Sequence, residues 1–233
     1  MIPTYNEKEN MQQLITKIFN LKIKDLHIVI VDDNSPDGTA ERVKELQKVY
    51  KNIHIVIRTQ NKGRGYAGAA GFEYCINNGA DYIVEMDADL SHNPKYIPAL
   101  LKELEHADMV LGSRGIQGGK DADRPWYRQI ITKGANFYIR ILLGVKVKDC
   151  NSGFRAFRKC VFEKIPPQTI RAKGPDIVQE ILYRAHLKRC TMTEVPIEFI
   201  ERKEGSSKLG MKQLWKGYTK ILELRVLHLR GKI

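Results

Sequence analysis

Short apolar runs alternate with amphipathic stretches through the first half of the chain. Residues 26–33, 52–58, 81–89 and 107–113 are rich in β-branched and apolar side chains, a pattern typical of strands in a buried parallel sheet. Between these runs lie stretches of about 12 to 15 residues with apolar side chains three and four positions apart, and 38–50 is one of them. This alternation predicts an α/β fold with a mostly parallel sheet and helices on both faces.

The second half of the chain follows a different pattern. Residues 115–124 are glycine-rich and charged, which predicts a loop. Helical spacing then covers 126–143 and 176–188, β-branched residues at 191–199 predict a strand, and an amphipathic pattern extends over 211–230. Since no repeat, low-complexity tract or Ser/Pro-rich linker interrupts these segments, they predict a single domain.

The charge of the chain is concentrated at its end. Lys and Arg number 39 against 27 Asp and Glu, which gives a net charge of +12. Residues 201–233 hold nine basic and three acidic residues, so they carry half of this excess. We therefore divide the chain into a domain at 1–210 and a basic amphipathic helix at 211–233. Such a charge favours nucleic acid, a membrane surface or a phosphorylated substrate as partner. Without a nucleic-acid-binding motif or basic–aromatic interleaving, nucleic acid is the weakest of these predictions.

Other features limit the cellular setting. No apolar run approaches the roughly 20 residues that span a bilayer, and no secretory signal is expected at the start of the chain. Cys75, Cys150, Cys160 and Cys190 are isolated and lack metal-ligand spacing. They predict reduced thiols in a protein that faces the cytosol.

Carboxylates follow two of the predicted strands. Asp32 and Asp33 end the run at 26–33, and Asp87 and Asp89 end the run at 81–89. Ligands of open α/β sheets bind at the carboxyl ends of strands, so these side chains should converge. Asp87 and Asp89 are two positions apart and point to one face in extended backbone, which suits a hard divalent ion. Taken alone, such a pair more often caps a helix or faces solvent, so it needs support from neighbouring motifs.

Gly63, Gly65 and Gly68 satisfy the GxGxxG pattern of dinucleotide-binding turns. That fingerprint normally follows the first strand of its fold, whereas here it follows at least the second. We favour the alternative that these small residues let a helix pack closely on the sheet. An NAD-dependent oxidoreductase remains a distant alternative.

The order of the motifs is more specific than any one of them. Together they resemble the nucleotide-sugar glycosyltransferases of family 2, which have the GT-A fold, and within that family the dolichol-phosphate mannosyltransferases and polyprenyl-phosphate glycosyl synthases. The resemblance extends from Ile2 to about Leu214. Its segments are IPTYNE (2–7), VDDNSPDGT (31–39), NKGRGYAGAAG (61–71), DADLSHNP (87–94), GSR (112–114), NSGFRAF (151–157) and VPIEFIERKEGSSKL (195–209).

The resemblance implies transfer of a hexose to dolichyl or polyprenyl phosphate with inversion, using mannose from GDP-mannose or, as the alternative, glucose from UDP-glucose. It implies Mg²⁺ or Mn²⁺ at Asp87 and Asp89, although Ser91 stands where Gln often completes the metal site. Nucleotide-binding roles fall on Pro3, Tyr5, Glu7, Asp32, Lys62 and Asp87. Roles around the sugar phosphate and acceptor phosphate fall on Arg114, Arg128, Ser152, Arg155, Arg202 and Lys208, of which Arg114, Arg128 and Arg202 are counted with Asp89 as catalytic.

The acceptor decides which catalytic groups are needed. A lipid monophosphate is largely dianionic at neutral pH and needs no general base. The task is then to offset repulsion between two phosphate groups, about 4 kcal/mol for unit charges at roughly 4 Å and an effective dielectric of 20. Arginine forks suit this task. A sugar hydroxyl would instead need a base, for which Asp176 and Glu180 are the candidates.

Two basic amphipathic helices are predicted at the membrane interface. The first, 126–143, combines Ile130 and Phe137 with Lys133 and Arg140. The alternative is that both helices pack their apolar sides on the domain core. We expect peripheral binding at the cytosolic face of a membrane, and the sequence leaves open whether a separate subunit anchors the enzyme. The apolar side predicted for the second helix consists of Leu214, Trp215, Tyr218, Ile221, Leu222 and Leu229.

Overall fold

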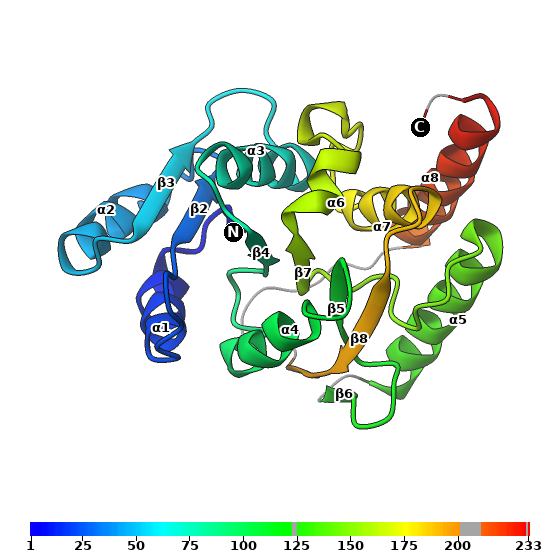
Figure 1. Cartoon of the computed structure of the whole chain (residues 1–233), viewed down its shortest axis with the longest axis horizontal. Coiled ribbons are helices and arrows are strands. Elements are labelled where there is room, and N and C mark those ends of the chain that lie inside the picture. Colours follow the sequence, from blue (N-terminus) through cyan, green and yellow to red (C-terminus); the bar gives the residue numbers. More distant parts are fainter. Residues whose placement is uncertain (123–124, 201–210, 232) are drawn as a thin grey trace.

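The computed structural model describes residues 1–122, 125–200, 211–231 and 233 of the chain (Figure 1). Its strands are β1 (Ile2–Thr4), β2 (Ile28–Asp32), β3 (Ile53–Ile57), β4 (Tyr82–Glu85), β5 (Met109–Ser113), β6 (Lys120–Ala122), β7 (Arg155–Arg158), β8 (Met192–Pro196) and β9 (Glu198–Ile200). Its α-helices are α1 (Lys8–Phe19), α2 (Thr39–Val49), α3 (Arg64–Asn77), α4 (Ile97–Glu103), α5 (Trp126–Leu143), α6 (Lys159–Lys164), α7 (Ile177–Leu187) and α8 (Met211–Leu229). Short 3₁₀ helices occupy Pro94–Tyr96 and Pro167–Thr169.

The main strands form one mostly parallel arrangement. β1, β2 and β3 pair in parallel, and β4, β7, β5 and β8 form a second group in which β7 runs antiparallel to both of its neighbours. Met1 joins the groups, because its nitrogen donates to the Val84 carbonyl at 2.7 Å and its carbonyl accepts from the Met86 nitrogen at 3.3 Å. The spatial order is therefore β3-β2-β1-β4-β7-β5-β8 (Figure 1). The predicted α/β fold with a mostly parallel sheet is confirmed.

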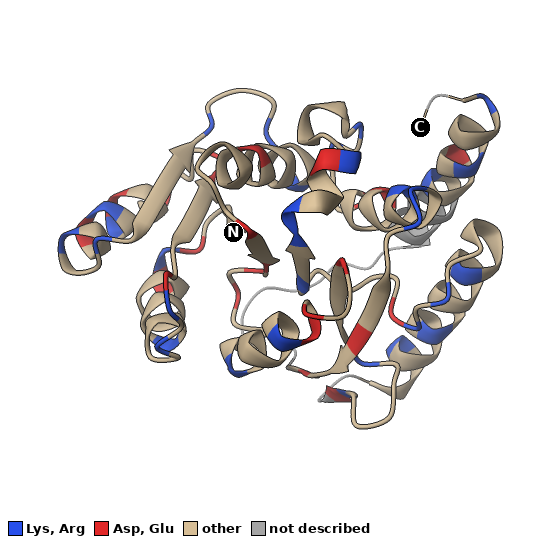
Figure 2. Cartoon of the chain, in the orientation of Figure 1, with Lys and Arg blue, Asp and Glu red and all other residues tan. Residues whose placement is uncertain are grey.

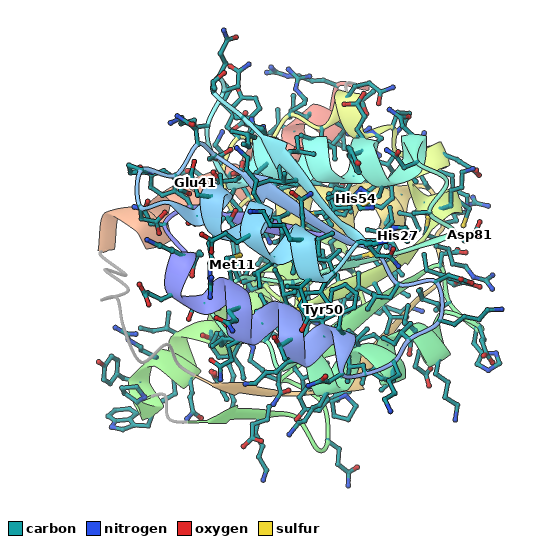
Figure 3. All side chains as sticks on the ribbon, turned by 90° about the vertical axis from the view of Figure 1, so that its left-hand side faces the viewer. Met11, His27, Glu41, Tyr50, His54 and Asp81 are labelled. Atoms are coloured by element: carbon teal, nitrogen blue, oxygen red, sulfur yellow. The ribbon has the colours of Figure 1, made fainter. Side chains whose placement is uncertain are left out.

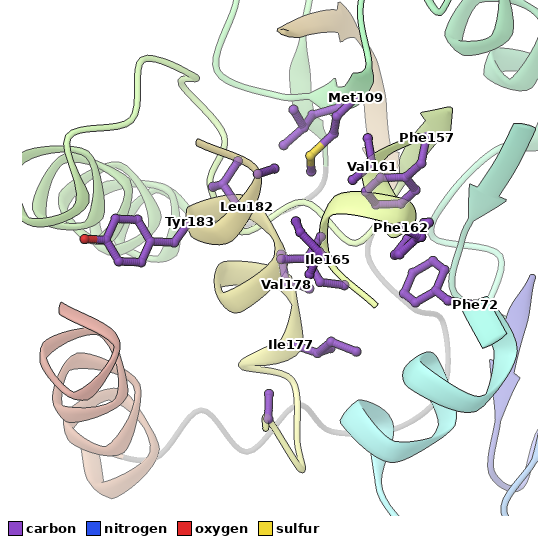
Figure 4. Packing of buried hydrophobic residues seen from close by; sticks show 14 of the residues in the cluster. Phe72, Met109, Phe157, Val161, Phe162, Ile165, Ile177, Val178, Leu182 and Tyr183 are labelled. Carbon is purple, nitrogen blue, oxygen red and sulfur yellow. The ribbon is translucent and has the colours of Figure 1, made fainter. Parts of the chain in front are cut away.

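Alternation along β2 explains why helices cover both faces of this sheet. All five of its residues are buried. Ile28 and Ile30 pack into a cluster with Met11 of α1, whereas Val29 and Val31 pack into a second cluster with Phe72 of α3. Figure 3 shows the α1 side and Figure 4 the other core, where Phe72 stacks on Phe162 with ring centroids 4.3 Å apart.

Several predicted elements match their observed bounds closely. The helix predicted over 126–143 is α5, and the helix predicted over 176–188 is α7, shorter by one residue at each end. The run at 191–199 divides into β8 and β9. The elements without a sequence-based prediction include α1, α6 and the antiparallel strand β7, and the segment 115–124 predicted as a loop contains the short strand β6.

The two amphipathic helices are only partly covered. On α5 the side with Ile139 and Leu143 is buried, while Trp126, Ile130, Phe137 and Ile141 are exposed. Among the described residues, no helix combines the length and apolarity needed to cross a membrane.

The apolar side predicted for α8 is only partly packed on the core. Ile221 and Leu224 are buried where α8 packs against α5 and α7, whereas Leu222 and Leu229 are exposed. Ile221 and Leu222 are adjacent and therefore point about 100° apart around the helix. Ile221 packs into the core, whereas Leu222 faces outward. The side chains of Leu214, Trp215 and Tyr218 lie outside the described part of the chain.

Gly65 is required by a close approach of backbone to backbone. A Cβ atom at Gly65 would lie 2.2 Å from the Ala172 carbonyl oxygen, whereas a Cβ at Gly134 in α5 meets nothing within 4 Å. We expect Gly65→Ala to destabilise the protein by about 1–3 kcal/mol or more, because backbone must shift. Gly134→Ala is the matched control and should stabilise by about 0.5–1 kcal/mol through helix propensity. Urea denaturation measures both, and equal effects would contradict the close approach.

Candidate active site

A cavity of about 640 Å³ opens at the carboxyl ends of β1, β2 and β4. This is the edge of the sheet where the sequence analysis placed the ligand. The glycine turn before α3 and the segment before α7 complete its wall. Its lining residues are Pro3, Thr4, Tyr5, Glu7, Asp33, Lys62, Gly63, Arg64, Ala67, Asp87, Ala88, Asp89 and Pro175.

The cavity gathers most of the residues that the resemblance assigned to the nucleotide. Pro3, Tyr5, Glu7, Lys62 and Asp87 all line it. Tyr5 is 55% exposed, so its ring is open to a ligand. The nucleotide side of the predicted site is therefore assembled from three separate segments of the chain.

Asp32 is the exception, and its predicted contact with the nucleotide is not supported by its position. Its side chain is fully buried, and its carboxylate accepts from the Thr4 hydroxyl at 3.0 Å and the Ser35 backbone nitrogen at 2.8 Å. Asp32 therefore ties the end of β1 to the turn after β2. The next residue, Asp33, lines the cavity instead.

Asp33 connects the end of β2 to the glycine turn. Its carboxylate accepts from the Gly63 backbone nitrogen at 2.6 Å and forms an ion pair with Arg58. Arg58 also donates to the Asn61 carbonyl. These bonds fix the turn that carries Lys62 to the cavity wall.

Asp87 and Asp89 present two carboxylates to the same cavity, as their spacing predicted. Among the described residues, no three His, Cys, Asp or Glu side chains form a group able to enclose a metal ion. Two carboxylates nevertheless fit Mg²⁺ or Mn²⁺, hard ions that are commonly held by one or two carboxylates together with substrate phosphates and water. The donor set therefore suits the expected metal and not a closed zinc-type site.

Ser91, where Gln often stands in the family, acts on Asp89. It is buried, and its hydroxyl and backbone nitrogen donate to Asp89 Oδ1 at 2.6 and 3.0 Å. Ser91 thus orients one of the two expected metal ligands.

His92 lies directly behind Asp87. Its Nδ1 accepts from the Asp87 backbone nitrogen at 3.1 Å, and its ring lies between Phe154 and Phe199, with centroid distances of 5.1 and 5.7 Å. Burial lowers the pKa of His92 despite the nearby carboxylates of Asp87 and Asp89, so the ring is neutral at physiological pH. A neutral imidazole can accept the hydrogen bond from the Asp87 backbone nitrogen, which fixes the turn at Asp87.

Arg155 is not a phosphate contact, which corrects the sequence-based assignment. It is 0% exposed and lies directly opposite Glu85 in the antiparallel β4–β7 register. Its Nε donates to Glu85 Oε2 at 2.9 Å and its Nη1 donates to the Val178 carbonyl at 3.0 Å. Its donors are therefore used within the core.

Glu85 pairs with a second arginine that the sequence analysis did not single out. Arg64 donates from Nη1 to Glu85 Oε1 at 2.7 Å and from Nη2 to Asp87 Oδ1 at 3.1 Å. Burial alone would raise the pKa of Glu85, but the charges of Arg155 and Arg64 leave it below its ordinary value. Burial alone would likewise lower the pKa of Arg64, which Glu85 and Asp87 raise above its usual range.

Arg114 lies beyond His92 and outside the cavity wall. It follows β5 and pairs with buried Asp149 through two bonds, Nε to Oδ2 at 2.7 Å and Nη2 to Oδ1 at 2.9 Å. Its guanidinium carbon lies 5.0 Å from the centre of the Phe199 ring, which also packs against His92. Burial alone raises the pKa of Asp149, but its bonds to Arg114 lower it overall.

The remaining predicted residues are not brought to the cavity. Ser152 is buried, and its hydroxyl bonds to the Phe154 backbone. Arg128 is half-buried on α5 and does not line the cavity. Arg202 and Lys208 lie outside the described residues. Their roles, like that of Arg114, stay predictions.

The two candidate bases differ in their surroundings. Glu180 is 1% exposed and accepts from the Arg171 and Ala172 backbone nitrogens at 3.0 and 2.7 Å, so it is a structural carboxylate. Asp176 accepts from the Gly174 nitrogen at 3.1 Å, just before α7. Neither carboxylate lines the cavity.

The sequence analysis overlooked Glu85, Arg64 and His92, and it named Asp33 only among the strand-end carboxylates expected to converge. Arg64 lies inside the GxGxxG pattern and His92 inside DADLSHNP, so a signal existed for both. For Glu85 the available signal was a lone acid in an otherwise apolar strand, a position that requires a buried partner.

Comparison with known proteins identifies the family. The sequence model for glycosyl transferase family 2 matches residues 1–166. The chain belongs to glycosyl transferase family 2. Polyprenol monophosphomannose synthase of Mycolicibacterium smegmatis is 38% identical to this family 2 chain over 235 residues, covering 100% of the chain and 87% of that protein. Undecaprenyl-phosphate mannosyltransferase of Micrococcus luteus is 36% identical, with coverages of 90% and 86%. Dolichol-phosphate mannosyltransferase of Pyrococcus furiosus is 40% identical, with coverages of 96% and 62%.

Solved structures with a similar fold support this architecture. Glucosyl-3-phosphoglycerate synthase of Mycobacterium tuberculosis in complex with UDP superposes with a TM-score of 0.71 at 18% identity, covering 97% of this chain and 78% of that one. The same enzyme in complex with Mn²⁺, UDP-glucose and phosphoglyceric acid gives a TM-score of 0.70 at 19% identity, with the same coverages. At this identity the likeness establishes the fold alone, which is the expected GT-A type.

Glu85 offers a test of the buried ion pairs. We expect Glu85→Gln to destabilise the protein by about 3–5 kcal/mol, because it leaves Arg155 buried without its counter-ion. Glu45→Gln is the matched control: Glu45 is 60% exposed in its pair with Arg42, so the loss should stay below about 1 kcal/mol. Denaturant unfolding measures both. The folded-state pKa of Glu85 is lowered, so wild type keeps the stability from this ion pair above the ordinary carboxyl pKa near 4 and loses it as the pH falls further. The difference in unfolding free energy between wild type and Glu85→Gln should therefore be constant between about pH 7 and pH 5 and shrink below about pH 4. A difference that grew with acidification would contradict the pairing.

Proposed function

We propose that this family 2 enzyme transfers mannose from GDP-mannose to a dolichyl or polyprenyl phosphate, with inversion at the anomeric carbon. The observation that carries the proposal is near-full-length similarity to three mannosyltransferases of polyprenol, undecaprenyl and dolichol phosphates, at 36–40% identity. The cavity adds the chemistry of a nucleotide-sugar site, because Asp87 and Asp89 line it together with Lys62 and Arg64. The glycines of GxGxxG serve close packing, which together with family membership removes the oxidoreductase alternative.

The donor would lie in the cavity with its diphosphate toward Asp87 and Asp89. These two carboxylates would hold Mg²⁺ or Mn²⁺, which when bound acts as a Lewis acid toward the departing diphosphate. Lys62 and Arg64 add fixed positive charge on the same wall. Pro3, Tyr5 and Glu7 would hold the base and ribose.

The acceptor phosphate is its own nucleophile. One of its oxygens attacks the anomeric carbon, the bond from that carbon to the diphosphate oxygen breaks, and the electron pair leaves with GDP. This displacement inverts the sugar and needs no general base, consistent with the position of Glu180 away from the cavity. Arg114, and beyond the described residues Arg202 and Lys208, would offset the repulsion between the two phosphates.

A thermal-shift panel tests donor and metal together. GDP-mannose with Mn²⁺ should raise the melting temperature more than UDP-glucose with Mn²⁺, and either nucleotide sugar should act less without the ion. Asp89→Asn should abolish the metal-dependent part, whereas the exposed control Asp25→Asn should not. Mannosyl transfer to polyprenyl phosphate completes the test. A larger shift with UDP-glucose would assign the enzyme to glucose, and a product with retained configuration would exclude direct displacement.

We further propose that α5 meets a lipid surface at the cytosolic face of a membrane, with or without a separate anchoring subunit. Trp126, Ile130, Phe137 and Ile141 are 59–73% exposed and lie four, seven and four positions apart, which aligns them along one side of the helix. Lys and Arg residues recur along the same helix (Figure 2). This composition is typical of helices that lie in a membrane interface.

Vesicle sedimentation tests the lipid contact. Wild type should bind anionic vesicles at low salt and release them at high salt. Replacing both Ile130 and Phe137 by Ser should weaken binding by about tenfold or more, because it removes buried apolar area. Val49→Ser is the control, since Val49 is 72% exposed on α2 at the opposite end of the molecule (Figure 1). Equal binding by wild type and the double variant would overturn this contact.

A further inference from the structure

Four charged side chains form a continuous line from the core to the cavity. Arg155, Glu85, Arg64 and Asp87 alternate in sign, and each contacts the next. The side chains of Arg155 and Glu85 are 0% exposed, that of Arg64 is 20% exposed, and that of Asp87 is 31% exposed. The line therefore begins in the interior and ends at a carboxylate expected to bind metal.

Arg64 is not needed to neutralise Glu85. Arg155 already donates two of its nitrogens to Glu85 Oε2 and is itself fully buried. One carboxylate cannot neutralise two guanidinium groups, so the charge balance of the line closes only when Arg64 also pairs with Asp87. The second contact, Nη2 to Asp87 Oδ1 at 3.1 Å, is longer than the 2.7 Å contact to Glu85.

Two glycines lie next to the guanidinium of Arg64. A Cβ atom added at Gly68 would come 3.6 Å from its Nη1, and one added at Gly153 would come 3.5 Å from its Nη2 and 3.4 Å from Asp87 Oδ2. Glycines at both positions therefore border the contact between Arg64 and Asp87. Arg64 also lines the cavity, so its charge is accessible to a ligand there.

From these contacts we infer that Arg64 is a built-in counter-ion of Asp87, which occupies its carboxylate in the metal-free enzyme and competes with the incoming cation. The inference rests on the proposed metal site at Asp87 and Asp89. Glu85 keeps Arg64 in place through the shorter contact, while the longer contact to Asp87 is the one that yields. In this role Arg64 is a positioning residue: it balances the charge of Asp87 and keeps that carboxylate ordered when no metal is bound.

The inference predicts that variants without the Arg64 charge bind Mn²⁺ more tightly, whereas a purely structural role of Arg64 predicts no increase in Mn²⁺ affinity. Removing the charge of Arg64 should tighten Mn²⁺ binding by nucleotide-free enzyme, by roughly fivefold or more, because a cation beside a ligand opposes a second cation. Isothermal titration with Mn²⁺ alone measures this in Arg64→Gln. Arg64→Met, of similar length, replaces that variant if it does not fold. Arg64→Lys keeps the charge and should stay within about twofold of wild type.

Arg58→Gln is the matched control, since it also removes an arginine charge near the cavity, but from a pair with Asp33. It should change the Mn²⁺ affinity by less than about twofold. If Arg64→Gln and Arg58→Gln increased the Mn²⁺ affinity equally, the change in net charge alone would explain the effect, and the inference would be overturned. Unchanged or weaker Mn²⁺ binding by Arg64→Gln would also overturn it.

The melting temperature gives a second readout. Metal-free Arg64→Gln should melt below wild type, and saturating Mn²⁺ should raise its melting temperature by more than it raises that of wild type. Asp89→Asn separates the two proposals. If wild type binds no Mn²⁺, or binds it no more tightly than Asp89→Asn does, the proposed metal site at Asp87 and Asp89 is wrong. If wild type binds Mn²⁺ and Asp89→Asn does not, a failure of the Arg64 variants counts against the counter-ion alone.

Discussion

The buried carboxylate of Glu85 is the interaction on which the arrangement of this enzyme depends. An ionised carboxylate without a partner would cost several kcal/mol in the interior, so a buried counter-ion such as Arg155 is obligatory. Arg155 comes from β7 and Arg64 from the start of α3, so one anion joins the N-terminal half of the fold to the C-terminal half. Because Asp87 follows Glu85 by two residues, the same anchor determines where the expected metal ligands lie.

Local pattern was sufficient to predict the features that depend on local geometry. Asp87 and Asp89 line one cavity, as their position after a predicted strand indicated, although Ala88 lines it as well and the backbone bends at 88–90. The bounds of α5 were also predictable, because Pro125 precedes the helix and Gly144 follows it in the left-handed conformation with φ 71°.

Predictions failed where partners come from distant segments. The resemblance implied that Arg155 contacts a phosphate, but the antiparallel register places it opposite Glu85, seventy positions earlier in the chain. Asp32 and Asp33 differ by one residue, and only the hydrogen bonds to Thr4 and Ser35 decide which of them turns inward. No periodicity in the sequence encodes either outcome, because both depend on which strands become neighbours.

The backbone contact at the glycine turn has a consequence for exchanging parts between family members. Gly65 donates to the Lys173 carbonyl at 3.1 Å, and a Cβ at Gly63 would lie 2.6 Å from that same oxygen. The turn that carries Lys62 and the segment that carries Pro175 are therefore packed directly against each other and must fit together. A graft that imports residues 61–65 from a relative with another donor would have to import residues 172–175 with them. Donor preference in this fold would then be inherited as a pair of loops and not one loop at a time.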